Sequence, residues 1–391
     1  MKSIVYIKKS ENDYEILIDY FLRRSIYFQK QLSKLGITRA GYLINFGGEF
    51  QYTHFDKHTN DQDTILILDN TIPVSELEEI EKYLEIKNIK VLGCVVENYY
   101  YGDKTILHDT ISSQAFSPNW YNKIRNSISK FSIPGYTCFD IESIEKAFAL
   151  LGKEYPRESI RLKLGNGNNG IDHYVVNDRN DLFLAMKVIN TYKQLDTSGV
   201  SVELNLENTI TYGVTRLSLN GEVINTLGKQ TFIDGVYVGS EIIEERGEFE
   251  NQAIQICNEA YKILEPFGQQ LNRFNVDIIT GTTKNNKRLT GIIDLSLRVG
   301  SATYIELEKL INNKATGVYH IYSRKKITKA TTELLKKTLE NTKIEIIVKS
   351  KYVFTLKYPT NESSFLESEE FKAIENKIKE INYYKNPLFR R

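Results

Sequence analysis

The sequence has few cysteines, few histidines and no excess of charge of either sign. Its three cysteines (Cys94, Cys138 and Cys257) lie far apart and form no C-x-x-C motif, so by themselves they make neither a disulfide framework nor a zinc site. The 51 Lys and Arg residues balance 50 Asp and Glu residues, which argues against nucleic acid or a membrane surface as a partner. No stretch approaches about 18 consecutive apolar residues, and the first residues show no signal-peptide pattern. We therefore expect a cytoplasmic protein.

The length and the order of the elements predict an α/β fold with more than one domain. A chain of 391 residues is too long for one ordinary domain, and 41% hydrophobic with 26% charged residues is usual for a globular protein. Strands and helices alternate over the first part of the chain, a rhythm that favours a parallel sheet. The segments that carry this rhythm are strands at 4–7, 64–68 and 89–96 and helices at 14–35 and after Ser75.

The stretch RLKLGNGNNG at 161–170 matches G-x-G-x-x-G through Gly165, Gly167 and Gly170. In a dinucleotide-binding unit this loop leads into a helix, whose N-terminus receives the pyrophosphate. Here it is followed by HYVV, which is typical of a strand, so the pattern predicts a hairpin; a helix at 171–176 would instead favour an NAD-dependent oxidoreductase. A Gly-rich hairpin tip can bind phosphates through its backbone N–H groups, with Lys163 as the nearby cation. An ordinary surface hairpin with a solvated lysine is the alternative interpretation.

Two carboxylates are predicted to meet across a second hairpin. If Asn285–Asn286 is the turn between FNVDIIT and GIIDLSLR, Asp277 lies directly opposite Asp294. Two like charges in this position repel each other, and a cation between them would remove the repulsion. Carboxylates that hold Mg²⁺ together with phosphate oxygens are usual in ATP sites.

Alternation along the second strand of this hairpin assigns further residues to its two faces. Ser296 and Arg298 share the face of Asp294, and Arg298 is suited to bind an anionic substrate or a phosphoryl group. The apolar residues Ile293, Leu295 and Leu297 are expected on the opposite face, toward a core. A solvent-exposed polar face with a different register is the alternative.

Taken in order, these elements resemble the ATP-grasp superfamily, in particular its peptide ligases. IPGYTCFDIESIEKAFALLG (133–152) looks like the segment before the phosphate lysine, and RLKLGNGNNGI like the lysine and glycine-loop strand pair. VELNLEN looks like the hinge that holds adenine, and NVDII with IDLSLRVGSAT like the metal-binding hairpin. The resemblance implies a preceding α/β domain at 1–118, an ATP-grasp domain at 119–315 and a C-terminal α/β extension at 316–391.

The resemblance also implies a role for individual residues. Lys163 would bind the α and β phosphates under a lid of Gly165, Gly167 and Gly170, and Lys123 is a further phosphate lysine. Glu203 would lie at the adenine and Glu207 at the ribose. Asp277, Asp294 and Ser296 would hold magnesium. Arg298 would face an acyl phosphate, and Lys229 is another candidate for the γ-phosphate.

The implied activity is that of an ADP-forming ligase that uses ATP and Mg²⁺ to join a carboxylate to an amine, with an amino acid or peptide among the candidate substrates. The low content of Cys and His agrees with this mechanism, which needs no separate catalytic nucleophile. Asp294 and Ser296 stand where the superfamily usually has Glu and Asn, so the alternative is an ATP-grasp-like protein that binds nucleotide without ligase turnover. Dimers are common in such ligases, and the oligomeric state is left open.

Overall fold

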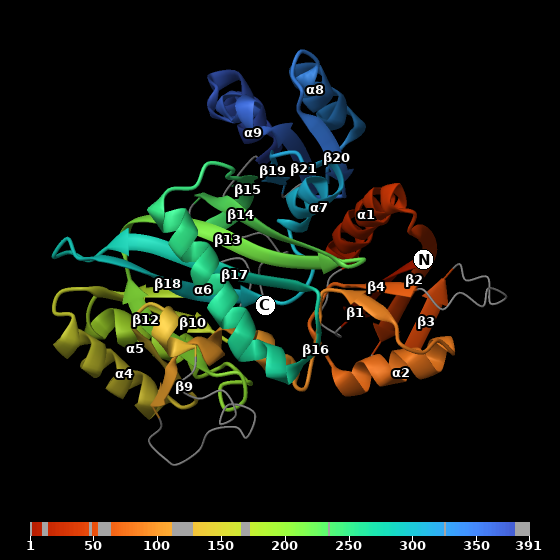
Figure 1. Ribbon diagram of the computed structural model, residues 1–391. Coiled ribbons are helices and arrows are strands. Elements are labelled where there is room, and N and C mark those ends of the chain that lie inside the picture. The colour runs from red at the N-terminus through yellow and green to blue at the C-terminus, as the bar shows by residue number, and fades with distance from the viewer. Residues whose placement is uncertain are drawn as a thin grey trace.

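The computed structural model describes residues 2–9, 15–46, 49–53, 64–111, 128–165, 173–233, 235–323 and 326–379. Strands in these residues form four sheets flanked by helices, which confirms the α/β class. Figure 1 shows the N-terminal sheet on the right, a mainly antiparallel sheet with α4 and α5 at the lower left, and the largest sheet between them. None of the helices described is both long and apolar enough to cross a membrane.

The N-terminal sheet has the strand order β3-β2-β1-β4-β6, with β1 parallel to both of its neighbours. Two of its strands, β2 and β3, were not predicted from the sequence. The strand expected at 89–96 is broken at Gly93, whose φ of +137° few other residues adopt, and its second half joins another sheet, β16-β7-β5. The elements of this region are β1 (Lys2–Lys9), α1 (Glu15–Leu32), β2 (Thr38–Phe46), β3 (Glu49–Thr53), β4 (Thr64–Leu68), β5 (Ile72–Pro73), α2 (Val74–Leu84), β6 (Lys90–Leu92) and β7 (Cys94–Val96).

The second sheet has the order β11-β10-β12-β9-β8 and carries the glycine-loop hairpin. Alternate residues of β10 and β12, among them Leu162 and Val202, pack against α4 and α5, so Lys163 and Glu203 point to the other face. Asp140 caps α4, as its position before the helix predicts, by accepting a hydrogen bond from the Ser143 N–H at 2.7 Å. The elements are β8 (Asp109–Ile111), β9 (Gly135–Cys138), α4 (Ile141–Glu154), β10 (Ser159–Leu164), β11 (His173–Val176), α5 (Arg179–Ile189) and β12 (Val200–Asn205).

The large sheet has the order β18-β17-β13-β14-β15-β19-β21-β20, and α6 covers one of its faces (Figure 1). Asn220 and Gly221 both have positive φ and form the turn between β13 and β14, as an Asn-Gly pair between two strands predicts. The last three strands come from the expected C-terminal extension, yet they continue this sheet. The elements are β13 (Glu207–Leu219), β14 (Glu222–Ile233), β15 (Val236–Ile242), α6 (Glu248–Leu264), β16 (Gly268–Leu271), β17 (Arg273–Thr282), β18 (Arg288–Ser296), α7 (Thr303–Asn312), β19 (Thr316–Tyr322), α8 (Lys329–Leu339), β20 (Glu345–Lys349), β21 (Val353–Pro359) and α9 (Glu369–Lys379).

Short 3-10 helices connect several of these elements, and one of them lies at the site described below. That helix, η3 (Lys104–Leu107), is buried and packs against β18 of the large sheet and against β9 and β12 of the second sheet. The others are η1 (Ser33–Leu35), η2 (Tyr99–Gly102), η4 (Ser129–Phe131), η5 (Glu265–Phe267) and η6 (Thr360–Glu367). The sequence NWYNKIRNSISKF at 119–131 predicts a further helix, and residues 119–127 of it lie outside the described residues.

Candidate nucleotide and metal site

The hairpin of β17 and β18 places Asp277 directly opposite Asp294, which confirms the predicted pairing of the two aspartates. The predicted turn is wrong, however. The Thr283 N–H donates to the Lys287 carbonyl at 2.9 Å, so the turn is longer than the expected two residues. The strand pairs next to this turn are therefore shifted by one residue from the predicted pairs. A β-bulge at Ile293 moves the register back, so the two aspartates meet although their turn differs from the expected one.

Because of the bulge, the side chains of β18 are distributed between the two faces of the sheet differently from the prediction. Leu295 and Leu297 lie in the core beneath α6 as expected, but Ile292 joins them there in place of Ile293. Ile293 instead packs against the apolar core of the second sheet, on the side of the two aspartates. Its carbonyl oxygen accepts a hydrogen bond from Lys163 Nζ at 3.1 Å, so the bulge joins the lysine strand to the aspartate hairpin.

The two aspartates have different surroundings. Asp277 accepts a hydrogen bond from Gln230 Nε2 at 2.7 Å, and its pKa is raised to about 7 by burial and by the Asp294 charge. Asp294 Oδ2 lies 3.3 Å from the ammonium of Lys104, which comes from η3. Lys104 was not predicted from the sequence, because it stands in a connection without a periodic pattern.

The aspartate pair fits a hard divalent cation that phosphate oxygens help to bind. Its donors are carboxylate oxygens, and the mutual repulsion of the pair would fall when a cation lies between them. No group of three or more His, Cys, Asp or Glu side chains in the described ranges is arranged to hold a metal ion. Magnesium commonly binds through one or two carboxylates and substrate phosphates, so two aspartates are sufficient for that type of site.

Lys163 lies at the centre of a buried charged group. Its ammonium forms an ion pair with Glu203, and each of the two side chains is no more than 3% exposed. Burial lowers the pKa of Lys163, and the Glu203 charge opposes that effect. Burial alone would raise the pKa of Glu203, but Lys163 and His108 outweigh it and leave this pKa below its ordinary value. His108 Nε2 lies 3.2 Å from the second carboxylate oxygen of Glu203.

Glu203, which the resemblance places at the adenine, is a buried partner of Lys163 and His108 on a central strand of the second sheet. Glu207 is exposed at the start of β13, outside this group. At the entry to the glycine loop, a Cβ on Gly165 would lie 2.1 Å from the Ser198 carbonyl oxygen, so the close approach there requires glycine. Gly167, Gly170 and Lys123 lie outside the described residues.

Arg298 is positioned by a second arginine that the sequence analysis missed. The Arg273 guanidinium binds Glu306 through two hydrogen bonds of 2.7 Å, and it also donates to the carbonyl oxygens of Ser296 and Arg298. Burial and the neighbouring Arg273 lower the pKa of Arg298, while Asp294 opposes the shift. Arg273 has the parity of Asp277 on β17, so strand alternation contained a signal for it; Glu306 on α7 had none.

Lys229 lies on the wrong face for the role that the resemblance implied. It stands two residues after Leu227, which packs in the core beneath α6, and it is opposite Tyr212 and Glu241 in the sheet. The Asp277 side chain lies on the other face. Alternation of side chains along β14 therefore separates Lys229 from the aspartate pair.

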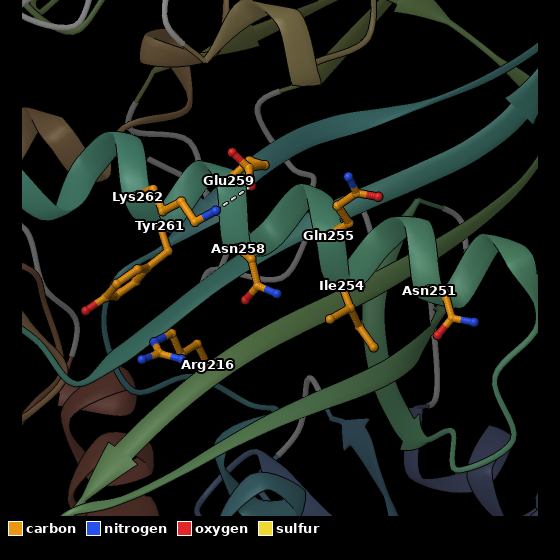
Figure 2. Close-up of a pocket in the computed structure, with 8 residues that line it drawn as sticks. All are labelled: Arg216, Asn251, Ile254, Gln255, Asn258, Glu259, Tyr261 and Lys262. Atoms are coloured by element: carbon orange, nitrogen blue, oxygen red, sulfur yellow. Dashed lines mark hydrogen bonds and ion pairs between the residues drawn. The ribbon is translucent and has the colours of Figure 1, made fainter.

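A surface pocket of about 470 Å³ also lies on the α6 side of the large sheet, away from the aspartates. Figure 2 shows the residues that line this pocket, with Arg216 of β13 on one side and a row of α6 side chains on the other. The Arg216 guanidinium lies 4.6 Å from the centre of the Tyr261 ring, and Lys262 pairs with Glu259 at 2.8 Å. These contacts are internal to α6 and its neighbouring strand, and the pocket holds none of the predicted site residues.

The chain matches a known protein family in sequence. A family model described as "Protein of unknown function (DUF3182)" matches residues 43–323, more than half of the chain. The chain belongs to this family. No curated protein matches it in sequence.

Solved structures show that the DUF3182 protein has an ATP-grasp fold. N5-carboxyaminoimidazole synthase of Aspergillus clavatus, in complex with ADP and 5-aminoimidazole ribonucleotide, matches with a TM-score of 0.58 at 11% identity over 96% of this chain and 99% of that one. The N5-carboxyaminoimidazole synthetase of Staphylococcus aureus, complexed with ADP, matches with a TM-score of 0.57 at 12% identity over 95% and 96%. D-alanyl-alanine synthetase A of Vibrio cholerae matches with a TM-score of 0.51 at 14% identity over 80% and 93%. The resemblance to the ATP-grasp superfamily is thus confirmed for the fold.

The same fold removes the oxidoreductase alternative. Residues 173–176 form β11, which pairs antiparallel with β10, so Lys163 lies opposite His173 in a hairpin. The glycine loop therefore leads into a strand, and a dinucleotide-binding unit would need a helix there.

Proposed function

We propose that this DUF3182 protein is an ATP- and Mg²⁺-dependent ligase that joins a carboxylate to an amine through an acyl phosphate. The observation that carries the proposal is the meeting of the Lys163 strand with the aspartate hairpin, where Lys163 binds the carbonyl of Ile293, next to Asp294. A buried lysine and two aspartates, which are the proposed phosphate-binding cation and metal ligands, thus come to one place from two sheets. Two of the structural neighbours were solved with ADP, which supports a nucleotide as the ligand of this place.

In the proposed reaction, an oxygen of the substrate carboxylate attacks the γ-phosphorus of ATP, and the bond from that phosphorus to ADP breaks. The amine nitrogen then attacks the acyl carbon, the carbon–oxygen bond to phosphate breaks, and the amine loses a proton. Mg²⁺, when bound, would supply positive charge against the phosphate oxygens. The protein itself has to hold anions together and exclude water.

We assign each of these tasks to particular residues of the site. Asp277 and Asp294 would hold the cation, and Lys163 would turn from Glu203 toward the phosphates. Arg298 would bind the phosphoryl group on which negative charge develops, held in place by the hydrogen bond that Arg273 donates to its carbonyl oxygen. The carboxylate and amine substrates are proposed to be small molecules, with amino acids and peptides among the candidates, and a homodimer is the oligomeric form to test.

A nucleotide-binding protein without ligase turnover is the second candidate, and one observation favours it. Ser296 offers a hydroxyl where the superfamily usually has an amide.

The release of ADP separates the two candidates. The protein would be incubated with ATP and Mg²⁺ and with pairs drawn from a panel of carboxylates and amines that includes amino acids and dipeptides. We expect ADP only when both a carboxylate and an amine are present, and none with Asp294→Asn. Binding of ATP without ADP release from any pair would favour the candidate without turnover.

A further inference from the structure

Lys104 lies beside one of the two carboxylates that are proposed to hold a metal ion. Its side chain is 3% exposed, and its Nζ is 3.3 Å from Asp294 Oδ2, the carboxylate that faces Asp277. A buried ammonium at this distance offsets part of the repulsion between the two aspartates without any metal. The residue is part of the site and yet has no place in the ATP-grasp pattern that the sequence resembles.

The position of Lys104 is fixed by η3 and its neighbours. The hydroxyl of Thr137 on β9 donates to the Thr105 carbonyl, and the hydroxyl of Ser201 on β12 donates to the Lys104 carbonyl at 3.4 Å. His108, one residue after η3, contacts Glu203. Because η3 also packs against β18, the ammonium is held between the second sheet and the aspartate hairpin.

The charges around Lys104 favour exclusion of a bare divalent cation. Asp277 and Asp294 are the acids that a cation would use. The positive charges of Lys104 and Arg298 already act on Asp294, and those of Lys104 and Arg273 act on Asp277. Asp103 is a third carboxyl group nearby, but burial raises its pKa to about 8, so it contributes little negative charge at pH 7. A divalent cation added alone would meet the ammonium at short range, whereas phosphate groups that arrive with it would offset the added charge.

We propose that Lys104 is an internal counter-ion of Asp294 that keeps free divalent cations out of the site, so that the metal binds only together with the nucleotide. The claim that the metal binds together with the nucleotide rests on the proposed function. The claim that Lys104 keeps free cations from Asp294 does not rest on it, and it is tested without nucleotide.

The test is isothermal titration of Mn²⁺ into the full-length protein without nucleotide. Lys104→Met removes the charge and keeps a side chain of similar length, and we expect it to bind Mn²⁺ at least about tenfold more tightly than the wild type. Lys104→Arg keeps the charge and is expected to bind Mn²⁺ as weakly as the wild type. The double variant Lys104→Met/Asp294→Asn should lose the gain, which would assign the new affinity to Asp294.

Equal Mn²⁺ affinity in Lys104→Met and in the wild type would overturn the proposal, as would tight binding of free Mn²⁺ by the wild type. Far-UV circular dichroism checks that the variants are folded. If Lys104→Met is not, Lys104→Gln replaces it with an amide that can still donate to Asp294, and the same outcomes apply. A gain in Mn²⁺ affinity with no ATP binding by any variant would reject the ligase and retain Lys104 as a counter-ion. Unchanged Mn²⁺ affinity with normal ATP binding would reject this inference alone.

Discussion

Lys163→Met is expected to lower the free energy of unfolding by about 3–5 kcal/mol, because it leaves the Glu203 carboxylate buried without its ammonium partner. Glu203 is 2% exposed, so water cannot take the place of the lost partner, and within the described part of the chain its ion pair with His108 is what is left. Urea denaturation followed by circular dichroism measures the change. The surface variant Lys187→Met, on an exposed part of α5, serves as the control and is expected to change stability by less than about 0.5 kcal/mol.

The double variant Lys163→Met/Glu203→Gln separates stability from function. Removing both charges avoids an unpaired buried ion, so most of the lost stability should return. We expect neither Lys163→Met nor the double variant to bind ATP, because the proposed phosphate-binding lysine is missing in both. A double variant that is stable and binds ATP like the wild type would show that Lys163 has a structural role only.

Arg298→Ala is expected to reduce the rate of ADP formation by about 10²–10³-fold while ATP affinity changes little. The guanidinium is proposed to bind the phosphoryl group where negative charge develops, and removal of one such group in a site closed to water commonly costs this much. The measurement is kcat for ADP release with the best carboxylate and amine pair, together with a separate titration of ATP.

Two further variants sharpen this prediction. Arg298→Lys keeps the charge but loses the planar pair of donors, so an intermediate rate is expected. Arg288→Ala removes an exposed arginine from the same hairpin and should leave kcat within about twofold of the wild type, since surface substitutions away from a site have small effects. A loss of ATP binding in Arg298→Ala, with no separate effect on kcat, would contradict the assigned role.

The aspartate hairpin shows how far sequence reasoning reaches. Alternation and strand pairing were enough to place Asp277 opposite Asp294, because side chains on opposed strands share a face. The turn and the bulge at Ile293 were not predictable, since each adds one residue and their effects on the register cancel. Only the structure shows that Ile293 lies on the aspartate side and offers its carbonyl to Lys163.

The contacts between distant segments of the chain could not be predicted from the sequence. Strand alternation could have placed Lys163 and Glu203 on one face of the second sheet, but the hinge resemblance assigned Glu203 to adenine. Lys104 and His108 stand in a connection that has no periodicity, and their partners are 95 or more residues away in the chain. Lys229 was misplaced because the resemblance gave a role without the face of the strand.

The central claim is that the aspartate hairpin holds a metal ion that a nucleotide needs. The most direct test is isothermal titration of ATP with Mg²⁺ into the wild type and into Asp294→Ala. We predict ATP binding by the wild type that weakens at least about tenfold in the variant, a loss of about 1.4 kcal/mol or more. No ATP binding by the wild type, or equal affinity in the variant, would contradict the claim.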